Sequence, residues 1–249
     1  MEPNPYMVDI NDSWRFEYKY RLSIQQYHQL KTALRPYISP DKYTSNQFQN
    51  RYIVRSLYFD STDLHAFQEK INGDCDRTKL RIRTYTATEK PDSEIRVEMK
   101  ARKGISVEKR NTFVTVDDYQ WFMKNKQWPA NSNPVLVEFE RYLHLKHLKP
   151  QILIEYFREG FFVNTQRGLR LTFDHNVKSA AATTLFPAKP FFYALHRNAV
   201  VFEIKCDKSQ PNWLFRLIKQ HNLSIAANSK FAQGIQLSRP EIIQPFWSY

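Results

Sequence analysis

Residues 94–102 read EIRVEMKAR, a run in which charged and apolar side chains alternate at every position. Neighbouring side chains of a β-strand point to opposite faces of the sheet, so this spacing predicts a strand with one charged face and one apolar face. The charged face carries both signs, because Glu98 lies between Arg96 and Lys100 in the alternating series. A face of this kind does more than make a strand soluble, since opposite charges on it are placed to compensate each other.

The same alternation recurs along the chain and defines most of the expected elements. Strands are predicted at residues 15–21, 79–83, 94–102, 137–140, 169–174 and 201–206. Helices are predicted at residues 23–34, 117–125 and 212–221, with Ser23 and Asn212 as N-caps. Residues 179–190 lack a clear period and contain two prolines, which indicates a loop.

The composition favours one domain with anionic partners. The chain has 249 residues, with 37 Lys and Arg against 25 Asp and Glu, so we expect a single domain over residues 1–249 with a formal charge of +12. Its 5 glycines form no phosphate-binding loop motif, so side chains have to hold any phosphate. Cys75 and Cys206 are isolated and suit reduced thiols. The sequence shows no signal peptide and no apolar run of about 18 residues, so a cytoplasmic location is expected.

Two arrangements account for strands with one charged face. In the first, the charges of each strand lie in water over a core, which is the default for any single strand. In the second, the sheet closes into a barrel with the charges inside and the apolar faces packed against outer helices. The second arrangement fits the whole set better, because a bound polyanion with a divalent metal would compensate the interior charges. The predicted fold class is therefore α+β, an antiparallel β-barrel with a charged interior and helices on the outside.

Short motifs spread over the chain resemble those of one family. They are RFEYKY from residue 15, VRSLYFD from 54, RTKLRIR from 77, VEMK from 97, EKR from 108, EYFREGF from 155, RLTFD from 170, VFEIK from 201 and SKF from 229. In this order they resemble the polyphosphate polymerase (VTC) domains of the triphosphate tunnel metalloenzyme superfamily. The resemblance implies a tunnel that binds ATP and inorganic polyphosphate, in which a polymerase adds the γ-phosphoryl group of ATP to a growing chain.

The resemblance also implies roles for individual residues. Basic residues of the family hold the phosphates, and they match Lys19, Arg81, Arg83, Lys100, Lys109, Arg158, Arg170 and Lys230, with Ser229 beside the last of them. Glu203 matches the carboxylate that holds a divalent metal, and Glu17 and Glu98 are candidate assistants, directly or through water. Mn²⁺ or Mg²⁺ suits such oxygen ligands.

Three other functions compete with the polymerase. A noncatalytic polyphosphate-binding module would keep the basic residues, and a tunnel triphosphatase would use water as the phosphate acceptor. Nucleic acid is not an expected partner, because aromatic residues alternate with the charged ones and so belong to the opposite, packed face. A separate membrane protein is a candidate partner for product export, so peripheral attachment to a membrane stays open.

Overall fold

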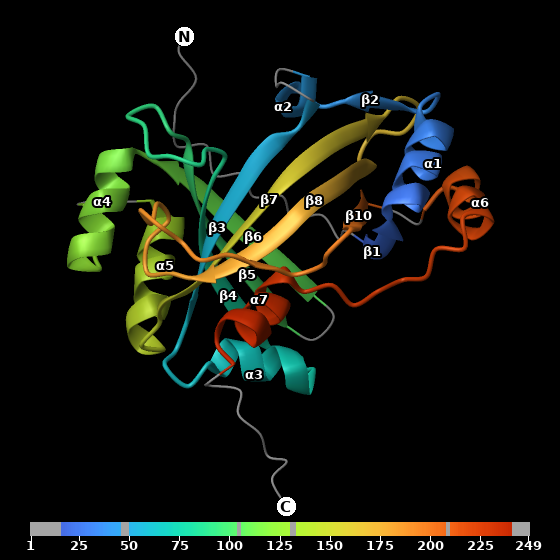
Figure 1. Ribbon diagram of the computed structural model, residues 1–249. Helices are drawn as coiled ribbons and strands as arrows, with labels where there is room; N and C mark the ends of the chain where they lie inside the picture. Colours follow the sequence, from blue (N-terminus) through green and yellow to red (C-terminus); the bar gives the residue numbers. More distant parts are fainter. Residues whose placement is uncertain (1–15, 46–49, 104–105, 130–132, 208–209, 241–249) are drawn as a thin grey trace, which may run out of the picture.

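The computed structural model describes residues 16–45, 50–103, 106–129, 133–207 and 210–240. Figure 1 shows a long, curled sheet with helices around it. The strands are β1 (Phe16–Ser23), β2 (Ile38–Pro40), β3 (Tyr52–Asp60), β4 (Arg77–Thr84), β5 (Ile95–Lys103), β6 (Ser106–Val114), β7 (Lys149–Val163), β8 (Arg170–Ala181), β9 (Tyr193–Ala194) and β10 (Ala199–Cys206). The helices are α1 (Ile24–Leu34), α2 (Lys42–Ser45), α3 (His65–Asn72), α4 (Val116–Asn125), α5 (Pro134–Leu145), α6 (Asn212–Gln220) and α7 (Lys230–Ser238).

All the strands belong to one antiparallel sheet. Its order is β1-β10-β8-β7-β3-β4-β5-β6, with β2 added beside β7 and β9 beside β8. A contact across the sheet shows that it curls strongly: Lys100 Nζ on β5 lies 3.4 Å from Glu17 Oε2 on β1, although five other strands separate β5 from β1 in the order. Within the described residues β1 and β6 form the two ends and do not pair with each other. The predicted α+β class and antiparallel sheet with a charged inner face are confirmed, and the sheet curls into a tunnel-like shape without closing into the predicted barrel.

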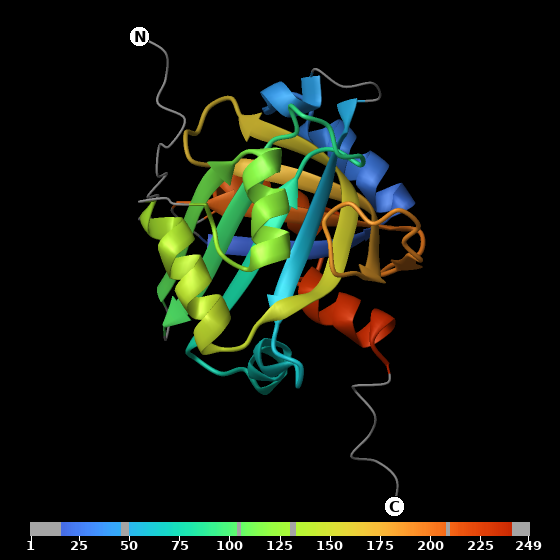
Figure 2. The ribbon, with the colours of Figure 1, turned by 90° about the vertical axis from the view of Figure 1, so that its left-hand side faces the viewer.

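Helices cover the convex face of the sheet at both ends of the strand order. Apolar residues of β4 and β5, such as Ile82 and Val97, pack against Phe122 of α4 and Phe139 of α5. Figure 2 shows these two helices lying across the strands. At the other end, α1 and α6 cover β1, β10 and β8 in a second core. The apolar half of the period-two pattern is therefore the outer wall, as the sequence predicts.

Helix α7 is different, because it packs on the concave side of β7 and β8. Phe231 of α7 contacts Tyr58, a concave-face residue of β3, with ring centroids 5.4 Å apart. Gly234 lies so close to β7 that an added Cβ would be 2.5 Å from Ile154 Cδ1. The expectation that helices lie outside the sheet therefore holds for α1, α4, α5 and α6, whereas α7 occupies part of the interior.

Two local predictions are wrong. Residues 137–140 are helical and form part of α5, which begins after the N-cap Asn133 with Pro134 at its first position. Pro is well suited to that position because its fixed φ matches the helix, and the buried residues Val135, Phe139 and Leu143 follow at helical spacing. Asn212 is not an N-cap, because α6 begins at this residue after Pro211. Ser23 does cap α1, through a capping box with Gln26.

The bounds of two predicted elements differ slightly from those in the structure. The predicted strand at residues 15–21 is β1, and Arg15 lies outside the described residues. The loop predicted at residues 179–190 begins later, because β8 continues to Ala181.

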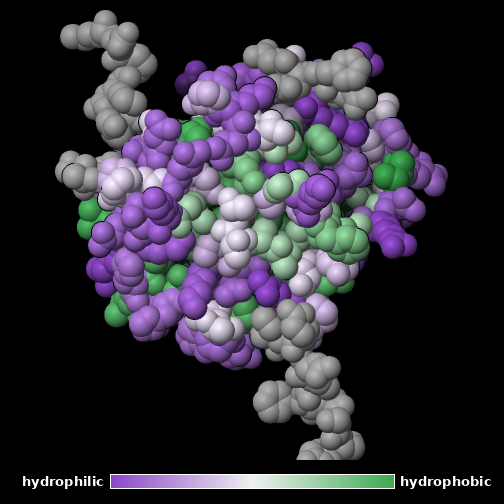
Figure 3. Space-filling model, turned by 60° about the vertical axis from the view of Figure 1, so that its left-hand side comes forward, coloured by the Kyte–Doolittle hydropathy of each residue, from purple (hydrophilic) through white to green (hydrophobic). Residues whose placement is uncertain are grey.

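The surface mixes polar and apolar residues. Figure 3 shows pale-green apolar residues gathered near the middle of one face, within a surround that is mostly purple and hydrophilic. No helix in the described part of the chain is long and apolar enough to span a membrane.

Candidate functional site

The predicted site residues lie together on the concave face of the sheet. The strand register makes several of them direct neighbours on paired strands. Lys19 lies opposite Glu203, Arg81 opposite Glu98, and Lys100 opposite Lys109. Side chains at directly opposed positions share a face, so these pairs extend the series from strand to strand. The concave face carries Glu17 and Lys19 of β1, Arg81 and Arg83 of β4, Glu98 and Lys100 of β5, Lys109 of β6, Arg158 of β7, Arg170 of β8 and Glu203 of β10.

Glu98 is the centre of the first charge cluster. Its side chain is buried, forms a short ion pair with Arg81 and lies 2.8 Å from Lys109 Nζ and 3.8 Å from Arg83 Nε. Burial alone would raise the pKa of Glu98, but the charges of Arg81, Arg83 and Lys109 outweigh it and hold the pKa well below its usual range. Glu98 is therefore ionised and fixes the positions of three cations.

Arg158 is the centre of the second cluster. It donates two hydrogen bonds to Asp174, at 2.6 and 2.8 Å, and a longer one of 3.5 Å to Glu203 Oε2. Lys230 Nζ, at the start of α7, lies 2.6 Å from the same Asp174 carboxylate. Burial opposes ionisation of Asp174, but Arg158 and Lys230 hold its pKa below the usual range. This cluster ties α7 to the adjacent strands β7, β8 and β10.

Glu17 and Glu203 form the third cluster with two lysines. Lys19 Nζ lies 3.4 Å from Glu17 Oε1 and 3.8 Å from Glu203 Oε1, and Lys205 Nζ lies 3.9 and 3.6 Å from the same two atoms. Two carboxylates that share ammonium groups also suit a divalent cation, since Mg²⁺ is commonly held by one or two carboxylates together with substrate phosphates. Glu98 does not join them, because the described residues contain no group of three or more acidic, His or Cys side chains placed for a metal.

The remaining predicted residues lie around these clusters. Arg170 Nη2 donates a 2.6 Å hydrogen bond to Asp41 Oδ2. Asp41 can approach because Gly160 has no side chain: an added Cβ there would lie 2.1 Å from Asp41 Oδ2. Ser229 caps α7 by accepting a hydrogen bond from Ala232 N, so its hydroxyl has a structural role next to Lys230.

The sequence matches a family model described as the VTC domain over residues 14–239. The chain belongs to the VTC domain family.

Comparison of structures agrees with the fold of this VTC domain. A crystal structure from Bacillus halodurans, named "putative adenylate cyclase", is 14% identical with a TM-score of 0.53 and covers 95% of this chain and 98% of its own. The structure of a Pyrococcus horikoshii protein is 12% identical, with a TM-score of 0.48, and the match covers 90% of this chain and 98% of that protein. No curated protein sequence matches the chain. Membership of the VTC family supports a function in binding polyphosphate or triphosphate.

The sequence interpretation missed several residues of the concave face. Asp174 was part of the alternating series with Arg170, and Lys205 part of the series with Glu203, but neither was expected in the site. Tyr52, Tyr58 and Tyr156 also lie on this face, contrary to the expectation that aromatic residues belong to the outer wall. The Arg81 guanidinium carbon lies 5.7 Å from the Tyr58 ring centre, and that of Arg158 lies 5.1 Å from the Tyr156 ring centre. These rings stack against the cations, which limits the rotamers of the two arginines.

Four lysines of the concave face have pKa values below the ordinary value of lysine. Burial lowers the pKa of Lys79 to about 7 and the pKa values of Lys19, Lys109 and Lys205 to about 8, from the ordinary 10.5. We expect tripolyphosphate affinity in metal-free buffer to fall between pH 7 and 9, because these ammonium groups lose their charge. Titration calorimetry at a series of pH values checks this, and an affinity that stays constant over this range contradicts it.

The same pKa values predict the opposite trend for stability without ligand. Above pH 7 the unfolded chain keeps these lysines protonated to about pH 10.5, whereas the folded protein releases their protons earlier. The unfolded state then binds more protons, so the free energy of unfolding rises with pH over this window. Thermal melts of the ligand-free protein should therefore shift upward from pH 7 to 9 while ligand affinity falls.

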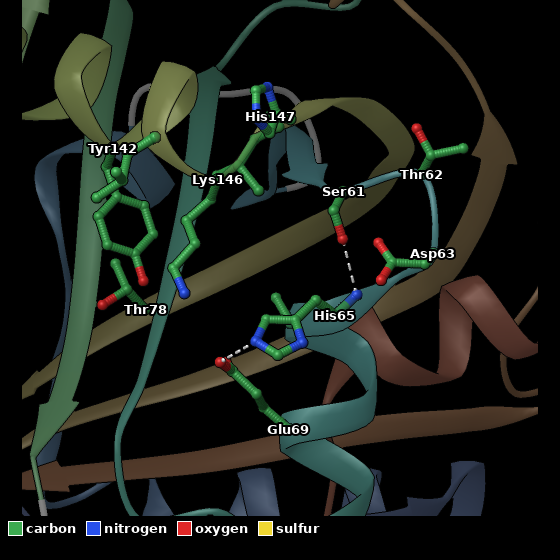
Figure 4. Close-up of a pocket in the computed structure, with 12 residues that line it drawn as sticks. Ser61, Thr62, Asp63, His65, Glu69, Thr78, Tyr142, Lys146 and His147 are labelled. Carbon is green, nitrogen blue, oxygen red and sulfur yellow. Dashed lines mark hydrogen bonds and ion pairs between the residues drawn. The ribbon is translucent and has the colours of Figure 1, made fainter.

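The cavity shown in Figure 4 lies outside the concave-face clusters. It has a volume of about 360 Å³ and lies between the start of α3 and the end of α5. His65 Nε2 contacts Glu69 at 3.0 Å, and the His65 amide donates to Ser61 Oγ at 3.0 Å. None of the predicted site residues lines this cavity.

Proposed function

We propose that this VTC domain is a polyphosphate polymerase, which transfers the γ-phosphoryl group of ATP to the end of a growing polyphosphate chain. The observation that carries the proposal is the set of basic side chains on the concave face, which come from β1, β4, β5, β6, β7 and β8 and from the start of α7. A linear polyanion can contact such a lining along its length, which suits a polymer better than a compact anion. Membership of the VTC family supports polyphosphate as that polymer.

The arginines suit the role of holding phosphate groups in register. Arg81 and Arg158 each contact a carboxylate and a tyrosine ring. Arg83 lies near Glu98 and donates a hydrogen bond to Ser56 Oγ, so the planar guanidinium groups of all three are already oriented. An oriented guanidinium binds two phosphate oxygens at once and loses little conformational entropy on binding. Incoming phosphates compete with Glu98 and Asp174 for these cations, so we expect the carboxylates to release part of each guanidinium when the chain binds.

Glu17 and Glu203 are the residues that we propose for the divalent metal, Mn²⁺ or Mg²⁺. Their carboxylates already face a shared cation position, where Lys19 and Lys205 now lie. A metal held there would neutralise charge on the phosphoryl oxygens during transfer. Glu98 is less suited to this role because Arg81, Arg83 and Lys109 surround it.

The proposed reaction requires positioning more than a protein nucleophile. A terminal oxygen of the polyphosphate chain attacks the γ-phosphorus of ATP, the bond between this phosphorus and its bridging oxygen breaks, and ADP leaves. Phosphoryl transfer of this type depends on in-line geometry and charge stabilisation, which the fixed basic residues provide. No covalent intermediate on the protein is required.

The test is incubation of the purified protein with ATP and Mn²⁺, with and without a short polyphosphate primer. Gel electrophoresis and ³¹P NMR then resolve the products. Lengthening chains support the polymerase, released phosphate without chains indicates a triphosphatase, and intact ATP with tight polyphosphate binding indicates a noncatalytic module. The cytoplasmic location and a separate membrane partner stay predictions.

A further inference from the structure

A second basic cleft lies on the convex face, away from the concave-face clusters. It has a volume of about 760 Å³ and lies among α1, β2, the residue before β3 and the end of β7. This volume is within the range of pockets that hold small organic ligands. The side chains that line the cleft include none of the site residues described above, so the cleft requires its own explanation.

One side of the cleft is basic and fixed in place by a buried carboxylate. Glu159 is 1% exposed, and it binds Lys31 Nζ at 2.7 Å and Arg51 Nε at 2.8 Å. The Tyr27 hydroxyl donates a 2.8 Å hydrogen bond to the same carboxylate. Burial alone would raise the pKa of Glu159, but hydrogen bonds from His175, Lys31 and Arg51 outweigh it and lower the pKa to about 2. Lys31 and Arg51 are therefore held at the cleft at all ordinary pH values.

The cleft has more positive charge than its carboxylate compensates. Arg35 also lines it, and within the described residues its guanidinium has no hydrogen-bond or ion-pair partner. Lys31, Arg35 and Arg51 together provide three positive charges against the one negative charge of Glu159. An anion in the cleft would balance this excess positive charge. A guanidinium group is well matched to phosphate oxygens, because it can donate two parallel hydrogen bonds to them.

Apolar residues also line the cleft. Ile38, Pro40 and Phe161 lie next to the basic residues, and Lys31 Nζ is 5.9 Å from the centre of the Phe161 ring. A cleft that combines cationic and apolar side chains favours ligands that combine a charged group with an apolar or planar group. Inorganic phosphate would use only half of such a cleft.

We propose that this convex-face cleft binds a small phosphorylated molecule with a planar or apolar portion, of the size of a nucleoside monophosphate. Arg35 and Lys31 contact the phosphate, and Phe161 and Pro40 contact the rest of the ligand. The cleft is separate from the concave face because successive residues of β7 point to opposite sides: Arg158 contacts Asp174 on the concave face, and Glu159 contacts Lys31 on the convex face. The proposal is therefore independent of the polymerase.

The test uses AMP as the probe and reports binding for each site separately. Backbone amide NMR spectra of the ¹⁵N-labelled protein are recorded with increasing AMP, inorganic phosphate or adenosine. We expect AMP to shift the amides of α1 saturably, and the two fragments to do so only at much higher concentrations. In Arg35→Glu the affinity measured at α1 should fall about tenfold or more, because a charge-assisted contact is lost and a repulsion added.

The matched control is Arg216→Glu, which makes the same charge change on the exposed side of α6 outside the cleft. It should leave the affinity measured at α1 unchanged. Two outcomes would overturn the proposal: α1 amides that do not move while amides of the concave-face strands do, or an equal loss of affinity in both variants. Arg35 and Arg216 are both exposed, so we expect both variants to fold. The dispersion of the amide signals in the same spectra checks this. Loss of polymerase activity would not affect this result, because the readout is binding at α1.

Discussion

Arg158→Ala should lower the melting temperature by about 10 °C and weaken polyphosphate binding about tenfold or more, because a charge-assisted contact is lost. Arg158 is buried and contacts both Asp174 and Glu203, so its removal leaves two buried carboxylates with fewer partners. Breaking a buried ion pair by removing one partner costs about 3–5 kcal/mol. In a chain of this size each kcal/mol lowers the melting temperature by roughly 2–4 °C. Calorimetric melts and polyphosphate titrations measure the two effects.

Arg141→Ala is the matched control for this variant. Arg141 is exposed on α5, and within the described residues its ion-pair partner is Glu138, a solvent-screened arrangement that contributes little to stability. It should melt and bind polyphosphate like the unmodified protein. An Arg158→Ala protein that keeps both properties would show that the concave-face cluster neither stabilises the sheet nor holds phosphate.

Glu203→Gln should reduce metal-dependent chain synthesis on the order of 100-fold, because a metal contributes several kcal/mol of charge stabilisation to the reaction. Polyphosphate binding without metal should persist or strengthen, since Lys19, Lys205 and Arg158 all lose a competing negative charge. The measurement is the synthesis rate over a range of Mn²⁺ concentrations, together with polyphosphate titrations in metal-free buffer.

Glu155→Gln provides the comparison for this result. Glu155 is also buried and paired, with Arg55 and Lys178, but it belongs to the convex side of β7. The variant should be less stable and yet make chains at the normal rate per folded molecule. If Glu203→Gln kept full metal-dependent synthesis, the carboxylate would have no part in holding a metal.

The strands with long alternating runs were predictable because a strand repeats every two residues. Residues 94–102 alternate over their whole length and coincide with β5, and the charged side chains of this run include Glu98 and Lys100 of the concave face. Residues 137–140 alternate for only four positions, and such a short run is also compatible with a helix. The preceding Asn133 and Pro134 are helix-start signals, and they decide the outcome.

The sequence predicts which residues belong to the site better than it predicts which of these residues contact each other. Arg158 and Asp174 are 16 residues apart in the sequence and meet only because β7 and β8 pair in one register, past a bulge near Glu155. Lys230 reaches Asp174 because α7 enters the concave side, and local spacing contains no information about that placement. Residue type and face were therefore accessible from the sequence, whereas cross-strand register and the position of α7 required the structure.

The alternation of Arg158 and Glu159 along β7 means that a single layer of backbone separates the two basic regions. Protein backbone screens charge poorly, so negative ligands on its two sides would repel each other across this layer. Each ligand would then weaken the other by the same factor, as thermodynamic linkage requires. Binding of either anion beside β7 would therefore lower the affinity of the protein for the other anion, without any movement of the chain.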